Sequence, residues 1–164
     1  MYYTIRKIRK NEYILLKDFL YEAIFIPEGV NPPPKSIIEQ PELQLYIKNF
    51  GNEKDDICFV AESDNKVIGA VWVRDMNDYG HIESGVPSFA ISLYKPFRGY
   101  GIGTSLMTAM LNELAVKGYK KASLAVQKEN YAVKMYKKVG FDIVDENDSE
   151  YIMVCELQKL NNPV

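Results

Sequence analysis

Cysteine and histidine are scarce in this chain of 164 residues, which has two cysteines and one histidine. The cysteines, Cys58 and Cys155, lie in apolar segments, where free thiols usually pack as small core residues. The histidine is His81, so the sequence contains no Cys and His cluster with the spacing of metal ligands. We therefore expect two buried free thiols and no metal site.

Long apolar runs and an excess of one charge are also lacking. No run approaches the roughly 20 apolar residues that span a bilayer, and residues 1–6 lack the apolar core of a signal peptide. The chain has 20 Lys and Arg against 22 Asp and Glu, a net charge of -2, so no basic footprint indicates a nucleic-acid partner. These absences favour a cytoplasmic protein that binds neither a membrane nor nucleic acid.

What the chain does contain is enough apolar sequence for one folded domain, with 47% hydrophobic residues. Apolar periodicity predicts strands near residues 2–8, 57–62, 66–74, 89–93, 122–126, 141–144 and 151–157. It predicts helices near residues 11–23, 36–50, 104–117 and 130–139, with Asn11 and Asn130 as caps and an interruption near Pro41 in the second. The order βααββ-βαβαββ indicates an α/β (α+β) fold, a mixed sheet of six to seven strands covered by helices.

A glycine-rich turn, Arg98-Gly99-Tyr100-Gly101-Ile102-Gly103-Thr104, joins a predicted strand to a predicted helix. Its N–H groups and the positive end of the helix can hold an anion. A dinucleotide site needs G-x-G-x-x-G, but the sixth positions are Thr104 and Leu106. A P-loop needs a lysine after its last glycine, and Gly103 is followed by Thr104. Two interpretations of the turn remain: a general phosphate site, or a tight connection that binds no ligand.

Two motifs resemble those of the GNAT family of N-acetyltransferases. Arg98-x-x-Gly101-x-Gly103 is similar to the family's acetyl-CoA motif. About 25 residues later, Asn130 and the segment Ala132-Val133-Lys134-Met135-Tyr136, ending in Gly140-Phe141, resemble its second signature. The resemblance implies a mostly antiparallel sheet in a single domain, with acceptor-side helices in residues 1–56, an acetyl-CoA-binding core in residues 57–157 and a short tail in residues 158–164.

The resemblance also implies which residues bind acetyl-CoA as co-substrate. The pyrophosphate would be bound by backbone N–H groups of the turn, at Arg98, Gly99, Tyr100, Gly101, Ile102, Gly103 and Thr104. The pantetheine arm would pair with the backbone of the preceding strand, at Ile91, Ser92 and Leu93, and contact Asn130. Tyr136 would lie near the thioester sulfur as the general acid. It also lies on the apolar stripe of its helix, and a core role is compatible with this chemistry.

The acceptor side is less defined in the sequence. Glu83, just before the strand at 89–93, is the nearest carboxylate for a general base, and Glu62, Asp75 and His81 compete with it. The family often has a glutamate near the start of this strand, but here Pro87 is followed by Ser88 and Phe89. That departure leaves room for a water chain instead.

The proline-rich segment at residues 27–41 has two interpretations. It could wall an acceptor cleft together with the nearby aromatic and apolar residues Phe25, Ile26, Tyr46 and Trp72. A rigid surface connection would give the same pattern.

The sequence thus predicts an acetyl-CoA-dependent N-acetyltransferase that acts by direct transfer to a primary amine of a small molecule or a protein. A non-catalytic acyl-CoA-binding or sensing module is the alternative, and another nucleotide-binding enzyme is disfavoured by the glycine spacing. The acceptor stays open, as does the choice between a monomer and a homodimer.

Overall fold

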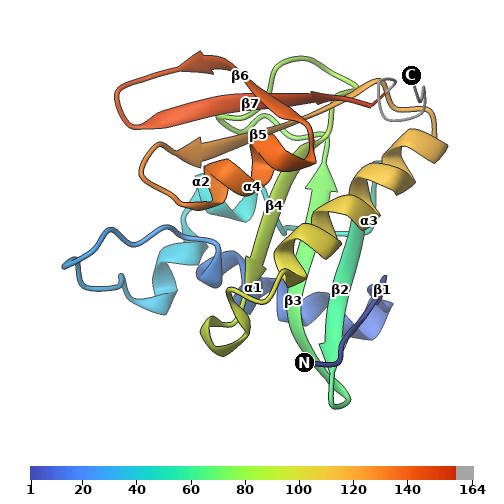
Figure 1. The fold of residues 1–164 in the computed structure, drawn as a ribbon, viewed down its shortest axis with the longest axis vertical. Helices are drawn as coiled ribbons and strands as arrows, with labels where there is room; N and C mark the ends of the chain where they lie inside the picture. The colour runs from blue at the N-terminus through green and yellow to red at the C-terminus, as the bar shows by residue number, and fades with distance from the viewer. Residues whose placement is uncertain (158–164) are drawn as a thin grey trace.

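Residues 1–157, which the computed structural model describes, form a seven-stranded sheet with helices on both faces (Figure 1). The strand order is β1-β2-β3-β4-β5-β7-β6. Neighbouring strands are antiparallel except β4 and β5, which are parallel. The predicted mixed, mostly antiparallel sheet is therefore confirmed, while the tail predicted at residues 158–164 lies outside the described residues.

The elements follow the predicted order. The strands are β1 (Thr4–Lys7), β2 (Ile57–Ser63), β3 (Lys66–Arg74), β4 (Ser88–Leu93), β5 (Lys121–Gln127), β6 (Phe141–Glu146) and β7 (Glu150–Glu156). The α-helices are α1 (Leu16–Glu22), α2 (Pro41–Gln44), α3 (Ile102–Val116) and α4 (Ala132–Val139). Short 3₁₀ helices occupy Lys10–Leu15, Lys35–Glu39 and Lys95–Phe97.

The N-terminal helices differ from the prediction. Asn11 is not a cap, because it lies inside the 3₁₀ helix that precedes α1, and the carboxylate of Glu12 instead accepts a hydrogen bond from the N–H of Arg9 at 2.8 Å. The helical pattern at residues 36–50, with the interruption predicted near Pro41, consists of a 3₁₀ helix and the short α2. Pro41 is the first residue of α2, where its missing N–H costs no helical hydrogen bond.

The apolar core lies in two layers, one on each face of the sheet. The larger layer packs α3 and α4 against the strands and contains Met107, Met110 and Cys155. The smaller layer packs α1 and contains Phe19, Cys58 and Trp72. Both thiols are buried and free, as predicted. Burial raises the pKa of Cys58 and brings that of Cys155 to about 11, so neither is a reactive thiolate near neutral pH.

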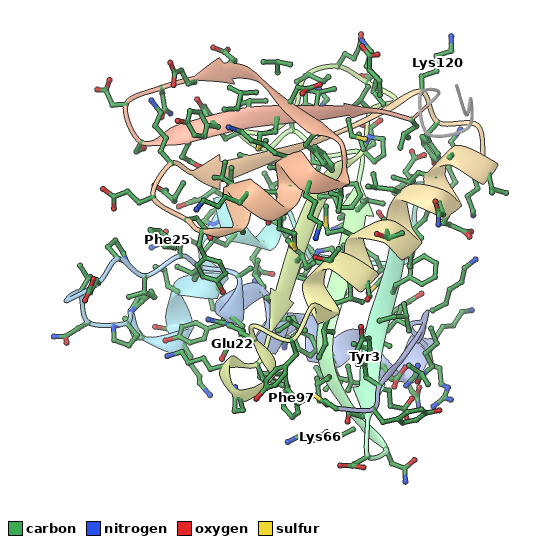
Figure 2. All side chains as sticks on the ribbon, in the orientation of Figure 1. Tyr3, Glu22, Phe25, Lys66, Phe97 and Lys120 are labelled. Carbon is green, nitrogen blue, oxygen red and sulfur yellow. The ribbon has the colours of Figure 1, made fainter. Side chains whose placement is uncertain are left out.

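Trp72 corrects one sequence interpretation. Its side chain is fully buried, and its Nε1 donates a hydrogen bond to the carbonyl of Tyr46 at 3.0 Å. Trp72 therefore belongs to the core under the segment that follows α2 and does not wall a cleft. Phe25 and Ile26 lie partly buried after α1, where Figure 2 labels Phe25, and their role at a cleft stays a prediction.

The sheet parts between its two parallel strands. Ser88 pairs with Ser123, and the N–H of Ser123 donates to the carbonyl of Pro87 at 3.0 Å. Within residues 1–157 no further β4–β5 ladder pair follows, although β4 stays paired with β3 and β5 with β7. Figure 1 shows β4 running down the view while β5 runs to the left. Beyond Ser88 and Ser123, two strand edges therefore face a gap.

Candidate active site

The glycine turn lies at the end of β4 and is built for backbone access. Gly99 and Gly101 have φ angles of +86° and +81°, in the left-handed region that favours glycine. A Cβ placed on either residue would meet no atom within 4 Å, so the space above the turn is open. Gly101 directly precedes α3, whose first N–H groups have no intrahelical acceptor. The turn therefore presents donors at the positive end of a helix and can hold an anion.

Gly103 has a different reason to be glycine. It lies inside α3, and a Cβ there would be 3.2 Å from the Sδ atom of Met135 on α4. That distance is tighter than ordinary van der Waals contact. Gly103 therefore lets α3 and α4 approach each other, in addition to the predicted contact of its N–H with a phosphate.

Arg98 acts as an anchor for the turn. Its Nε donates to the carbonyl of Leu93 at 2.9 Å, and its Nη2 lies 3.1 Å from Oε2 of Glu22 and 3.2 Å from the Glu22 carbonyl. Its own N–H donates to the carbonyl of Lys95 at 3.2 Å. Figure 2 shows Glu22 beside the segment that follows β4. These bonds fasten the turn to the end of α1, so Arg98 positions the turn.

The β4 residues predicted to line a pantetheine arm have side chains that are used in packing, so their backbone groups are the ones left for a ligand. Ser92 is buried, and its Oγ donates to the carbonyl of Phe19 on α1 at 2.6 Å. Leu93 is buried and Ile91 is packed against the same apolar layer as α3. The edge of β4 that faces the gap carries N–H and C=O groups, which can pair with an extended ligand as an added strand.

Asn130 lies two residues before α4, and Tyr131 occupies the N-cap position that the sequence predicted for Asn130. Its Oδ1 accepts a hydrogen bond from the N–H of Ala132 at 2.9 Å. This bond fixes the side chain at the helix end and uses its carbonyl oxygen. The amide NH₂ group can still donate to a ligand.

Tyr136 combines a buried ring with a hydroxyl that bonds to none of the described residues. The residue is 8% exposed, and its ring lies 6.2 Å from that of Phe141, which lies 5.6 Å from that of Phe89 on β4. Burial raises the pKa of Tyr136, so the phenol stays protonated near neutral pH and can donate a hydrogen bond. The core role and the donor role are thus compatible in the fold.

The sequence-predicted bases lie in different places. Glu83 is in the loop between β3 and β4, its side chain is 60% exposed, and its Oε1 is 3.9 Å from Nζ of Lys121. Glu62 is paired with Arg6 at 2.6 Å on β2. Asp75 accepts the N–H of Gly85 at 2.9 Å. Because Lys121 begins β5, Glu83 lies near the closed end of the β4–β5 pair, and its role as a base stays a prediction.

A polar cluster that the sequence did not indicate joins the two parting strands. Asp78 accepts hydrogen bonds from the Tyr46 hydroxyl at 2.8 Å and from Oγ of Ser88 at 3.0 Å. Oγ of Ser88 lies 3.3 Å from Oγ of Ser123, and both serines are fully buried. Burial and the charge of Asp78 raise the pKa of Tyr46, which keeps its phenol a donor. Since no motif contains these residues, only the fold brings them together.

Across residues 1–157, no group of three or more His, Cys, Asp and Glu side chains is arranged to hold a metal ion. The helices of this part of the chain include none that is long and apolar enough to cross a membrane.

Comparison with known proteins agrees with this geometry. An acetyltransferase of Pectobacterium atrosepticum is 32% identical over 107 residues, which cover 64% of this chain and 70% of that protein. The PaiA N-acetyltransferase of Thermoplasma acidophilum, crystallised with coenzyme A, superposes with a TM-score of 0.70 at 20% identity, covering 95% of this chain and 99% of that one.

A spermidine N-acetyltransferase chimera from Vibrio cholerae and hSSAT superposes with a TM-score of 0.67 at 21% identity, covering 98% of this chain and 99% of that chain. At such identities these structures share the fold. The Acetyltransferase (GNAT) family itself matches residues 20–141, which include both motifs up to Phe141. The glycine turn, the parted strands and this match show that the chain belongs to the GNAT family of acetyltransferases.

Proposed function

We propose that this protein transfers an acetyl group from acetyl-CoA directly to the nitrogen of a primary amine. The observation that carries the proposal is the edge of β4 after Ser88, which has no ladder pair with β5 and leads, after Leu93 and a short 3₁₀ helix, to the glycine turn. An extended backbone edge is thus followed closely in the chain by the proposed phosphate-binding turn. This arrangement suits a donor that has a pyrophosphate at one end and a thioester at the other.

The donor would lie along this edge. The β4 strand has six residues and spans roughly 17 Å. The pyrophosphate would accept hydrogen bonds from N–H groups between Gly99 and Thr104, while the pantetheine amides pair with β4 near Ile91 and Leu93. The NH₂ group of Asn130 would donate to the same arm. These contacts hold the thioester beside Tyr136.

Tyr136 would stabilise the departing thiolate. A phenol with an ordinary pKa of about 10 protonates a thiolate whose acid has a pKa of about 8.5 only uphill, by about 2 kcal/mol. Burial makes early full transfer harder still, because it raises the pKa of Tyr136. A hydrogen bond that strengthens as charge develops on sulfur is enough for catalysis. Tyr136 is therefore proposed as a hydrogen-bond donor that completes proton transfer after the C–S bond weakens.

The acceptor amine must lose a proton. An alkyl amine with a pKa of about 10.4 is mostly protonated at pH 7, and its neutral form costs about 4.6 kcal/mol to reach. Binding the amine and the thioester in attack geometry lowers the barrier without a covalent enzyme intermediate. Glu83 is the sequence-predicted base. The similarity in fold to a spermidine acetyltransferase chimera supports testing polyamines first.

The experiment is a screen of primary amines with acetyl-CoA, including spermidine, free lysine and a peptide with an unmodified N-terminus. Release of coenzyme A thiol together with an acetylated acceptor in the mass spectrum is expected for at least one class. Reactions without protein serve as the control. Coenzyme A binding in calorimetry with no acetylated product from any amine would instead support the acyl-CoA-binding module, which the exposed position of Glu83 favours.

A further inference from the structure

The point where β4 and β5 part contains a line of hydroxyl groups that leads to a carboxylate. We propose that Ser123, Ser88 and Asp78 form a proton relay that carries the acceptor's proton out of the β4–β5 gap. This inference rests on the proposed function, since it assigns the proton path of the same site. It replaces a directly acting base at the start of β4 with a path through two buried serines.

The hydrogen bonds give the relay a direction. A serine hydroxyl has one proton, and that of Ser88 is donated to Oδ1 of Asp78 at 3.0 Å. In the 3.3 Å bond between the two serines, Ser123 must therefore be the donor and Ser88 the acceptor. The protons of both hydroxyls thus point toward Asp78. The lone pairs of Ser123 Oγ are left to accept a proton at the other end.

The accepting end lies where the reaction is proposed to occur. Ser88 and Ser123 form the last rung before the strand edges separate. Phe89 follows Ser88, and its ring contacts Phe141, which contacts the ring of Tyr136. Because neighbouring side chains on a strand point to opposite faces, the rings of Phe89 and Tyr136 lie on the α3–α4 side of the sheet and the Ser88 hydroxyl lies on the other side. The glycine turn lies at the opposite end of β4.

Asp78 is held firmly at the other end of the relay. Oδ2 accepts the Tyr46 hydroxyl at 2.8 Å, and the Asp78 carbonyl accepts the N–H of His81 at 3.1 Å. Gly80 lies against the backbone of β5, where a Cβ would be 3.0 Å from the N atom of Ala125. The loop is thereby fastened to the strand that carries Ser123.

The charged and titratable groups around Asp78 come from several elements. Tyr46 donates from the segment after α2, Nδ1 of His81 is buried without a partner among the described residues, and the charge of Glu150 on β7 also acts on Tyr46. Accepting two hydroxyl protons requires both oxygens of Asp78 to be acceptors, as in a carboxylate. The resting state is thus ready to receive a proton.

A proton that reaches Asp78 has a route to water, because Asp78 is only half-buried. The three residues before it in the loop, Asp75, Met76 and Asn77, line a groove of about 440 Å³, but Asp78 itself does not line it.

The proton balance fits a single relay. The ammonium form of the acceptor and the thioester give an amide, a free thiol and one surplus proton. The ammonium nitrogen has no lone pair, so one of its three protons passes to Ser123 Oγ before attack. The proton of Ser123 moves to Ser88 Oγ, that of Ser88 moves to Oδ1 of Asp78, and Asp78 releases this surplus proton to water. The neutral amine then bonds to the carbonyl carbon, and one of its two remaining protons stays on the amide. The thiolate takes its proton from Tyr136, which regains one from the other nitrogen proton through water.

The test compares Asp78→Asn and Ser123→Ala with the parent, using the best amine from the screen. We expect Asp78→Asn to lower kcat about 100-fold at neutral pH, with the KM for acetyl-CoA changed less than about twofold. The difference in kcat between Asp78→Asn and the parent should become smaller as the pH approaches the pKa of the amine, because the neutral amine then needs no base. Ser123→Ala removes one buried oxygen and should lower kcat about 10-fold, with little further loss in the double variant because both act on one path.

A purely structural role would give a different pattern. Asp64→Asn, in the β2–β3 turn, removes the same charge far from the gap and should behave as the parent. A deficit in either relay variant that stays constant across pH, or kcat values within about twofold of the parent for both, would overturn the relay while leaving the proposed function in place. A parent protein that acetylates no amine would remove both proposals, because the relay would then have no proton to carry.

Discussion

The two ends of β4 carry different kinds of chemistry. At the C-terminal end, the glycine turn and the unpaired strand edge offer backbone N–H and C=O groups, and Arg98 and Ser92 use their side chains to hold that backbone in place. At the N-terminal end, the polar groups are side chains from four separate segments, joined through Asp78. The proposed donor binding thus depends on one continuous stretch of chain, whereas the proposed proton path depends on how the chain folds.

The largest effect is expected at the glycine turn, which follows the C-terminal end of β4. Gly101→Val would place a β-branched side chain at a left-handed φ and fill the open space over the turn, so coenzyme A affinity should fall about 100-fold or more in calorimetry. Gly118→Val is the matched control, because Gly118 has a φ of +88° and equally open space at the other end of α3. Both variants should lose a similar stability of about 1–2 kcal/mol in thermal unfolding. Equal loss of affinity in both would show that the turn does not hold the pyrophosphate.

The next largest effect is expected at Tyr136, the proposed hydrogen-bond donor to the departing thiolate. Tyr136→Phe removes the hydroxyl and keeps the buried ring, so kcat should fall about 10- to 100-fold while coenzyme A affinity is nearly unchanged. Tyr2→Phe, on a side chain that is 84% exposed, provides the control. Turnover equal to that of the parent would remove Tyr136 from the chemistry and leave it as a core aromatic.

A smaller effect is expected from the anchor beneath the turn. Arg98→Met removes the hydrogen bonds to Leu93 and Glu22 and should lower coenzyme A affinity about fivefold and stability by about 1–2 kcal/mol. Glu22→Gln keeps the backbone bonds of Arg98 and removes one charge, so its effect on both quantities should be smaller. A coenzyme A affinity unchanged in Arg98→Met would show that the turn keeps its shape without this anchor.

The smallest effect is expected at Ser92 on β4, where a substitution distinguishes a role of the side chain from a role of the backbone. Ser92→Ala removes the hydrogen bond to the Phe19 carbonyl and should reduce the free energy of unfolding by about 1 kcal/mol. The KM for acetyl-CoA should stay within about twofold, because the proposed contact at Ser92 uses backbone atoms. A large rise in KM with unchanged stability would assign the Ser92 hydroxyl to the ligand.

The proposed donor half rests on residues that are close together in sequence. The turn from Arg98 to Thr104 and the segment from Asn130 to Tyr136 are each short and continuous, so both could be identified by their resemblance to the motifs of the GNAT family. The anchor between Arg98 and Glu22 joins residues 76 positions apart and could not be predicted. The error at Asn11 arose because the chain first forms a 3₁₀ helix there, which apolar periodicity does not distinguish from an α-helix.

The proposed relay had no sequence signal. Tyr46 and Asp78 are 32 positions apart, and Ser88 and Ser123 are 35 apart. Serine is among the commonest residues, and a single aspartate in a polar loop has no spacing that marks it. Glu83 was selected instead because it precedes β4 in the chain, but in the fold it lies beside Lys121 with most of its side chain exposed.

The sequence by itself determined the order of elements, the glycine turn before α3 and the helix that carries Tyr136, because each depends on backbone preferences within a few residues. Only the tertiary structure decided where β4 and β5 part and which side chains meet there. Strand pairing is a long-range property, and the single rung between Ser88 and Ser123 depends on the packing of the loop at Asp78 and Gly80 against β5.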